Sequence, residues 1–201
     1  EEAITSIFAQ SYNNWELLLV DDGSTDHSTV IAQKYAQKYS EKVFYLEHEG
    51  HQNKGMSASR NLGISQANGE YIGFLDADDM WLPQKLEEQV ALLTSHPEAA
   101  MVYGRTQIWY SWTGKPEDSQ RDHFYDLGVQ PNTLVNPPTL LLLLLQNQCQ
   151  TPTTCNALIR REVFEKIGKF ENVFRTMYED QVFFSKVILQ KPVFVAGQCW
   201  A

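Results

Sequence analysis

The stretch "EYIGFLDADDMWLP", residues 70–83, joins a short apolar run to three carboxylates within four positions. The run "YIGFL" (71–75) has the length and composition of a buried β-strand. Asp76, Asp78 and Asp79 follow it directly, and Pro83 suits the first turn of a helix. Carboxylates at this spacing repel one another, so we expect either a helix dipole or a bound cation to offset the repulsion.

Strands and helices alternate on both sides of this stretch. The sequence predicts strands at 15–20, 42–48, 71–75 and 99–104, with helices at 27–40, 56–67 and 83–96 between them. This pattern indicates the α/β class, with a mostly parallel central sheet flanked by helices.

The second half is less regular. It predicts an exposed strand at 105–113, a polar loop at 114–132, a helix over the leucines 140–145, a strand at 153–159, helices at 161–168 and 178–191, and a strand at 192–197. The six leucines predict a buried helix, since they fall well short of the roughly 18 apolar residues that a membrane span needs.

Composition narrows the class of protein. A chain of 201 residues with 43% apolar content suits one buried domain, and a net charge of −9 without Lys/Arg runs argues against a nucleic-acid binder. Cys149, Cys155 and Cys199 are odd in number and lack C-x-x-C spacing, which favours neither disulfides nor zinc and suits a reducing cytoplasm. No signal peptide or membrane-spanning segment is expected in these residues.

A second acidic cluster, "DDGSTD" (21–26), follows the strand at 15–20. Ligands of an open parallel sheet bind beyond the carboxyl ends of its strands, so Asp21 and Asp22 are expected to converge with residues 76–79 on one cleft. Convergent carboxylates suit Mg²⁺ or Mn²⁺ that shares its ligands with a diphosphate. Each cluster alone also fits a turn or a helix cap.

Two further segments carry candidate residues. In "NKGMSASRN" (53–61), Gly55 permits a tight turn, Ser57 can cap the helix, and Arg60 is either a phosphate or base ligand or a surface arginine. In "YEDQ" (178–181), Glu179 and Asp180 begin a helix, where they act as capping carboxylates or supply a general base.

In this order, the motifs "VDDGSTD", "NKGMSASRNLGI", "GEYIGFLDADDMWLPQKLE", "RREVFEKIGKFEN" and "YEDQVFFSKV" resemble those of family 2 glycosyltransferases. These are inverting enzymes of the Rossmann-like GT-A fold that use nucleotide-diphospho-sugars. The resemblance implies one domain over 1–201, with a donor-binding half at 1–104 and an acceptor-binding, base-carrying half at 105–201. It implies a UDP-sugar donor, and a saccharide or lipid-linked acceptor of cell-envelope polysaccharide synthesis, at the inner face of the membrane.

The resemblance also implies roles on the donor side. Asp22 matches the aspartate that hydrogen-bonds the nucleotide base, with Asp21 supporting its loop, and Arg60 matches the arginine that reaches the nucleotide. Asp76 and Asp78 match the D-x-D motif, in which Asp78 would hold the Mn²⁺ or Mg²⁺ that bridges the diphosphate.

On the acceptor side, Asp180 matches the catalytic base, which takes the proton of the attacking hydroxyl in a single displacement. Glu179 is its neighbour in the E-D motif, and Asp79 is a further supporting carboxylate. Acceptor recognition is expected between 105 and 150, where Trp109, Tyr110 and Trp112 either stack on sugar rings or pack a core or an interface.

The sequence departs from the family pattern in two respects. The usual opening strand, of the type V-S-V-I-I-P-x-Y-N, is missing, so we expect a sheet that lacks its first strand and binds nucleotide more weakly. The Q-x-x-R-W signature of processive synthases is also absent, which favours single-sugar transfer. A non-catalytic relative that only binds nucleotide-sugar is the alternative, whereas a haloacid-dehalogenase-type phosphatase would place its D-x-D near the start of the fold.

Overall fold

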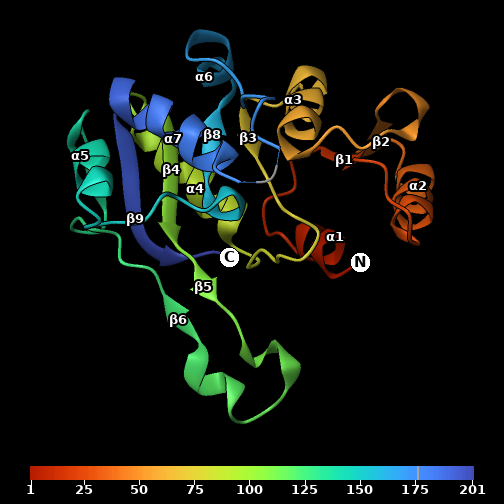
Figure 1. Ribbon diagram of the computed structural model, residues 1–201, viewed down its shortest axis with the longest axis horizontal. Coiled ribbons are helices and arrows are strands. Elements are labelled where there is room, and N and C mark those ends of the chain that lie inside the picture. The colour runs from red at the N-terminus through yellow and green to blue at the C-terminus, as the bar shows by residue number, and fades with distance from the viewer. Residues whose placement is uncertain (176) are drawn as a thin grey trace.

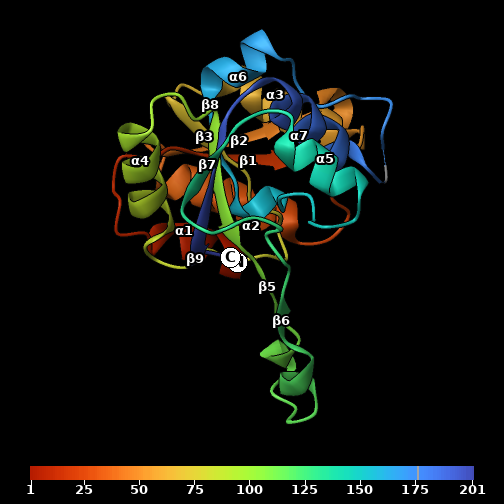
Figure 2. The same ribbon diagram turned by 90° about the vertical axis from the view of Figure 1, so that its left-hand side faces the viewer.

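A computed structural model of the chain describes residues 1–175 and 177–201. It is a mixed α/β structure with helices packed around a central sheet (Figures 1 and 2). The helices are α1 (Glu2–Phe8), α2 (Ser28–Lys38), α3 (Met56–Gln66), α4 (Lys85–Ser95), α5 (Thr139–Leu145), α6 (Arg161–Lys166) and α7 (Glu179–Gln190). The strands are β1 (Leu17–Asp21), β2 (Val43–Glu47), β3 (Tyr71–Gly73), β4 (Met101–Arg105), β5 (Gln107–Ile108), β6 (His123–Phe124), β7 (Thr133–Val135), β8 (Leu158–Arg160) and β9 (Val193–Cys199).

The central sheet has five strands in the order β3-β8-β4-β9-β7. The predicted α/β class, with a central sheet flanked by helices, is confirmed. The prediction of a mostly parallel sheet is wrong, because β8 runs antiparallel to both β3 and β4, and β7 runs antiparallel to β9. After β4 the chain makes a long excursion and returns to the end of the sheet at which β4 stopped. The next strand of the sheet, β7, therefore runs in the opposite direction to β4.

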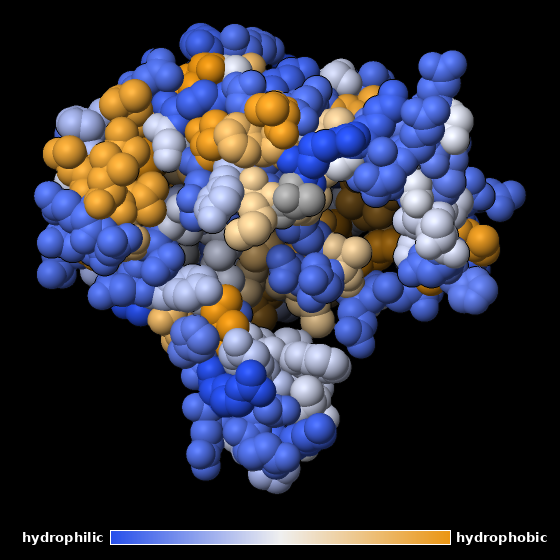
Figure 3. Space-filling model, in the orientation of Figure 1, coloured by the Kyte–Doolittle hydropathy of each residue, from blue (hydrophilic) through white to orange (hydrophobic). Residues whose placement is uncertain are grey.

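A break separates this sheet from the other two strands of the first half. β1 and β2 form a parallel pair of their own, and no strand in the described part of the chain joins β1 to β3. A cavity of about 920 Å³ lies between β1 and β3, lined by residues of these two strands and by Ile7 and Ile64. Figure 3 shows apolar side chains in the hollow beside the β1–β2 lobe. Residues 1–16 form α1 and a loop, so the opening strand that is usual in the family has no counterpart in them.

The main core lies between the sheet and α7. Phe183 is fully buried and stacks on Phe164 and Phe170, with ring centroids 5.2 and 4.5 Å apart. Phe74, which directly follows β3, meets Phe170 edge-on at 5.4 Å. Aromatic contacts therefore fix the start of α7 close to the chain that leaves β3.

The leucine helix α5 packs on α7 by one face only. Leu140 is buried, but Leu142 and Leu145 are 52% and 72% exposed, so the prediction of a buried helix is wrong. A seven-residue helix that packs on one neighbour leaves the rest of its surface to solvent. In the described residues, no helix has both the length and the apolar content to cross a lipid bilayer.

Residues 105–132 contain an arm that projects from the body of the molecule (Figures 1 and 2). The arm is ordered by Asp122, whose carboxylate accepts the backbone N–H groups of Tyr110 and Ser111 at 2.6 and 2.9 Å. Trp109 and Trp112 are 51% and 69% exposed, so they do not pack a core. Stacking of these rings on sugars stays a prediction.

Helix α4 buries a lysine that sequence reasoning did not single out. Lys85 is fully buried, its Nζ donates to Gln89 Oε1 at 2.5 Å and to the Asn156 carbonyl at 3.4 Å, and it lies over the Trp81 ring. None of these partners is a carboxylate. Burial lowers the pKa of Lys85 from 10.5 to about 7, because the charged form is poorly solvated there.

Lys85 makes the stability of the fold depend on pH. Since the folded-state pKa is depressed, the unfolded chain binds the proton more tightly between pH 7 and 10.5, and stability rises with pH across that window. We expect a slope of up to about 1 kcal/mol per pH unit in urea unfolding from this residue. Lys85→Met should flatten the slope, whereas Lys34→Met, at the surface of α2, should leave it unchanged; equal slopes in all three proteins would contradict the assignment.

Candidate functional site

The first acidic residue of "DDGSTD" is built into the fold. Asp21 is 7% exposed, and its carboxylate accepts hydrogen bonds from Ser24 N (2.8 Å), Thr29 Oγ1 (2.5 Å) and Tyr45 Oη (3.1 Å). Burial alone would raise the pKa of Asp21, but these donors outweigh it and lower the pKa to about 2. Asp21 therefore holds the loop after β1 through these hydrogen bonds, and its role in nucleotide binding stays a prediction.

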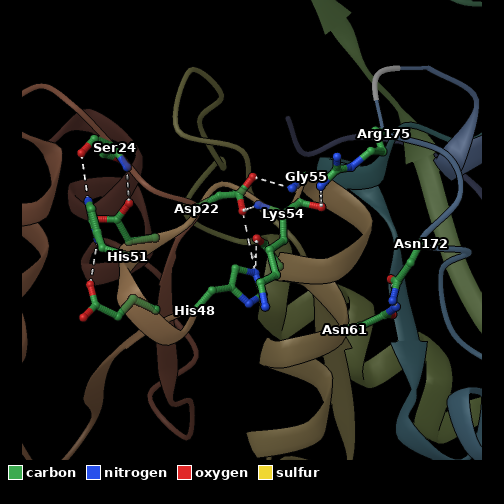
Figure 4. A network of polar contacts seen from close by, with 12 residues as sticks. Asp22, Ser24, His48, His51, Lys54, Gly55, Asn61, Asn172 and Arg175 are labelled. Carbon is green, nitrogen blue, oxygen red and sulfur yellow. Dashed lines mark hydrogen bonds and ion pairs between the residues drawn. The ribbon is translucent and has the colours of Figure 1, made fainter.

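Asp22 joins this loop to the segment before α3 (Figure 4). Its two carboxylate oxygens accept the backbone N–H groups of Lys54 and Gly55 at 2.7 and 2.9 Å. Gly55 has φ +90°, a conformation that disfavours side chains, and Arg175 reaches the same turn by donating to the Lys54 carbonyl at 3.3 Å. Asp22 thus ties the end of β1 to the loop at 53–55, and Arg175 ties that loop to its own segment near the start of α7.

Two histidines flank Asp22, and sequence reasoning missed both. His48 Nε2 lies 3.6 Å from Asp22 Oδ1 and 3.0 Å from Ser59 Oγ, and His51 pairs with Glu47 at 2.7 Å and with the Ser24 carbonyl at 2.9 Å (Figure 4). The bond to the Ser24 carbonyl, followed by that to Glu47, raises the pKa of His51. The available signal was the segment "HEGH" directly after the second strand.

Helix α3 anchors the segment that leads to α7. The prediction that Ser57 caps this helix is wrong: the N-cap is Gly55, and Ser57 is buried, with its Oγ donating to the Phe174 carbonyl at 3.0 Å. Asn61 bonds both the carbonyl and the N–H of Phe170, at 2.8 and 3.1 Å, and pairs with Asn172 (Figure 4). The segment 170–174 is therefore fixed on α3.

Arg60, on the same helix, is 9% exposed and is not a surface residue. Its Nη2 donates to both carboxylate oxygens of Asp76 at 3.1 Å, and its Nη1 donates to Glu179 Oε1 at 3.3 Å. Glu179 lies 119 residues further along the chain and is itself 5% exposed. One guanidinium thus brings the acidic loop after β3 and the first turn of α7 into a single site.

The acidic loop presents its carboxylates differently. Asp76 is partly exposed beside Arg60, Asp78 is exposed, and Asp79 points inward, where burial raises its pKa against the opposing hydrogen bond of the Cys155 thiol. Among the described residues, no cluster of three or more His, Cys, Asp or Glu side chains could hold a metal ion alone. Hard oxygens on one loop, with an exposed Asp78, fit Mg²⁺ or Mn²⁺ held by one or two carboxylates together with substrate phosphates.

Asp180 follows Glu179 in the first turn of α7 and is partly buried. Burial raises the pKa of its carboxyl, the neighbouring Glu179 charge raises it further, and the Gln181 N–H and the Arg60 charge oppose the rise. A carboxylate with an elevated pKa is better suited to accept a proton near neutral pH.

Contacts connect most of the predicted residues. Asp21, Asp22, Arg60 and Asp76 all line the cavity between β1 and β3, and Arg60 links Asp76 to Glu179. Asp78 and Asp180 lie within two residues of this linkage, on the same loop and the same helix turn. The site can therefore bind an anionic ligand with a cation on one side and accept a proton on the other.

Curated proteins similar to this chain are described as glycosyltransferases. EpsE of Bacillus subtilis is 46% identical over 95 residues, which are 47% of this chain and 34% of EpsE. TuaG of the same organism, described as a teichuronic acid biosynthesis glycosyltransferase, is 40% identical over 95 residues, 46% of this chain and 36% of TuaG. A Nostoc glycosyltransferase is 28% identical over 178 residues, 89% of this chain and 52% of that protein. The chain thus spans between about a third and a half of these relatives.

Solved structures share the fold. TarS 1–349 of S. aureus, crystallised with UDP, superposes with a TM-score of 0.71 at 19% identity, covering 99% of this chain and 54% of that one. The mannosyltransferase PcManGT of Pyrobaculum calidifontis, solved with GDP-Man and Mn²⁺, gives 0.66 at 17% identity over 99% and 51% of the two chains. These likenesses confirm the predicted GT-A fold. The sequence profile described as "Glycosyl transferase family 2" matches residues 1–168, and the chain belongs to that family.

Proposed function

We propose that this chain is the donor-binding and base-carrying part of an inverting glycosyltransferase that moves a sugar from a nucleotide-diphospho-sugar to an acceptor hydroxyl. The observation that carries the proposal is the contact of Arg60 with both Asp76 and Glu179. This contact joins the D-x-D loop to the E-D turn, which are far apart in sequence, and so supports the proposal that both act on one donor.

The donor is proposed to be a UDP-sugar, in keeping with the UDP complex of TarS. Asp22 would accept a hydrogen bond from the base: each of its carboxylate oxygens has a second lone pair besides the one used by the Lys54 or Gly55 N–H. Asp21 keeps Asp22 in place through the loop after β1. The acceptor is proposed to be a saccharide or a lipid-linked precursor of a cell-envelope polysaccharide, a role suggested by the description of TuaG as a teichuronic acid biosynthesis glycosyltransferase.

The chemistry follows from the two sides of the site. Asp180 takes the proton from the acceptor hydroxyl, whose oxygen attacks the anomeric carbon from the face opposite the diphosphate. The bond from that carbon to the diphosphate oxygen breaks, and the nucleoside diphosphate leaves with the electron pair, so the configuration inverts. A divalent cation held at Asp78 supplies a Lewis acid for the charge that develops on the leaving group.

Titration calorimetry with UDP in the presence and absence of Mn²⁺, followed by a UDP-release assay over a panel of acceptors, tests the proposal. Metal-dependent UDP binding with acceptor-stimulated release is the expected result. Binding without release would favour the non-catalytic alternative, and absence of both would reject the proposed function.

Asp78→Asn is expected to remove the metal dependence of UDP binding. The exposed carboxylate is the proposed cation ligand, and an amide oxygen is a much poorer ligand because it carries no charge. The affinity for UDP with Mn²⁺ should fall at least about tenfold, towards its metal-free value. Glu98→Gln, which removes one exposed charge from the loop between α4 and β4, is the control, and an unchanged Mn²⁺ effect in Asp78→Asn would remove Asp78 from this role.

A further inference from the structure

We propose that Arg60 is a positioning residue that couples donor binding to the placement of the catalytic base, by holding Asp76 of the acidic loop and Glu179 of α7 on one guanidinium. The kinetic part of this inference rests on the proposed function. The coupling itself is a property of binding and is measured without turnover.

The geometry requires an arginine. Nη2 donates to both oxygens of Asp76 while Nη1 donates to Glu179, so two carboxylates on different elements share one planar fork. A lysine ammonium is a single point of charge, and it cannot hold two carboxylates in the same fixed orientation. Substitution by lysine would keep the charge and lose the geometry.

Two further side chains, those of Phe170 and Met56, contact the Arg60 guanidinium. It lies 5.4 Å from the centroid of the Phe170 ring, and Met56 Sδ accepts from Nη2 at 3.5 Å. Asn61 of α3 makes two hydrogen bonds to the backbone of Phe170. The Phe170 ring that contacts the guanidinium is therefore held against the same helix that carries Arg60. A displacement of the Arg60 guanidinium would therefore also displace the carboxylates of Asp76 and Glu179, to which it is bonded.

Charge balance links the two sides. The bridge contains two carboxylates and one guanidinium, and Oε2 of Glu179 is buried with no hydrogen-bond partner among the described residues. If Glu179 loses its charge, the positive charge of Arg60 acts fully on Asp76 and on any cation beside it. Because coupling between two sites is reciprocal, a donor and cation bound at the Asp76 side must also change the hold on Glu179 and hence on α7.

A double-mutant cycle tests this coupling. Binding of UDP with Mn²⁺ is measured by calorimetry for the wild type, Glu179→Gln, Arg60→Gln and the double variant, with folding checked by circular dichroism. We expect Glu179→Gln to weaken binding at least about fivefold when Arg60 is present and less than about twofold when it is absent. The same factor in both backgrounds would overturn the coupling. If Arg60→Gln does not fold, Arg60→Lys takes its place in the cycle.

Kinetics separates positioning from a merely structural role. Arg60→Lys should lower kcat at least about tenfold while the donor KM changes less than about threefold, because the base is misplaced and the donor still binds. Arg161→Gln, an exposed arginine at the start of α6, is the matched control and should match the wild type. Equal loss in kcat and in donor affinity would contradict a positioning role.

The outcomes also separate the coupling from the proposed function. A wild-type chain that binds no nucleotide would reject both together. A chain that binds nucleotide but shows no interaction between Arg60 and Glu179 in the double-mutant cycle would reject the coupling alone.

Discussion

Asp180→Asn is expected to lower sugar transfer by about 10²- to 10⁴-fold while leaving metal-dependent UDP binding within about twofold of wild type. The substitution keeps the shape of the side chain and its place at the start of α7, but it removes the group that accepts the hydroxyl proton. In the proposed function, donor binding depends mainly on the loops that follow β1 and β3, and Asp180 takes no direct part in it. Single-turnover transfer and UDP calorimetry on the same preparations make the comparison.

The pH profile gives a second measure of the same role. A general base must be deprotonated, so kcat/KM should rise with pH through the pKa of Asp180, which burial places above the ordinary value for an aspartate. The residual activity of Asp180→Asn should lack this rise. Glu165→Gln, an exposed acid on α6, is the control and should keep it. Near-normal turnover in Asp180→Asn would assign the base to another group.

The sequence predicted the elements that carry the acidic motifs well because local signals agreed with one another. "YIGFLDADD" was placed as a strand followed by an acidic loop, and "YEDQ" as the start of a helix; both are confirmed by β3 and α7. Apolar runs of strand length, followed by turn residues, leave few alternatives. The convergence of Asp21 and Asp22 with residues 76–79 was expected from the ends of their strands. That "YEDQ" joins the same site could be inferred only from the resemblance, since no local pattern indicates that Arg60 reaches Glu179.

The predictions that failed concern strand direction and side-chain burial, which depend on contacts between residues far apart in the sequence. Strand direction was wrong for β8, and β7 was not predicted at all, because strand direction is set by where an excursion returns the chain and not by composition. The burial of Lys85 was not foreseen, since a lysine within the helical pattern at 83–96 looks like any solvated residue until Gln89 and the Asn156 carbonyl are placed against it. The exposure of Leu142 and Leu145 was missed for the same reason: burial depends on which neighbours pack there.

An added strand before Glu1 is expected to stabilise this chain markedly. Glu1 lines the cavity between β1 and β3, and each of these strands pairs on one edge only within the described residues. A designed extension of the type V-S-V-I-I-P-x-Y-N would place four apolar side chains between them. Their burial removes apolar surface from water, and the strand gains ladder hydrogen bonds to the free edges of β1 and β3. We expect a net gain in stability, measured as a rise in Tm of roughly 2–4 °C for each kcal/mol.

Two control extensions separate strand pairing from mere lengthening. A Gly-Ser extension of equal length should leave Tm unchanged, and a variant with proline in the middle of the apolar run should lose most of the gain, since proline cannot donate to a strand ladder. The pairing strand should also tighten UDP binding. Asp22 follows β1 and Asp76 follows β3, so the added strand would fix the two sides of the donor site relative to each other. A rise in Tm without tighter UDP binding would show that the cavity accepts a strand but that the spacing of these two carboxylates does not limit donor affinity.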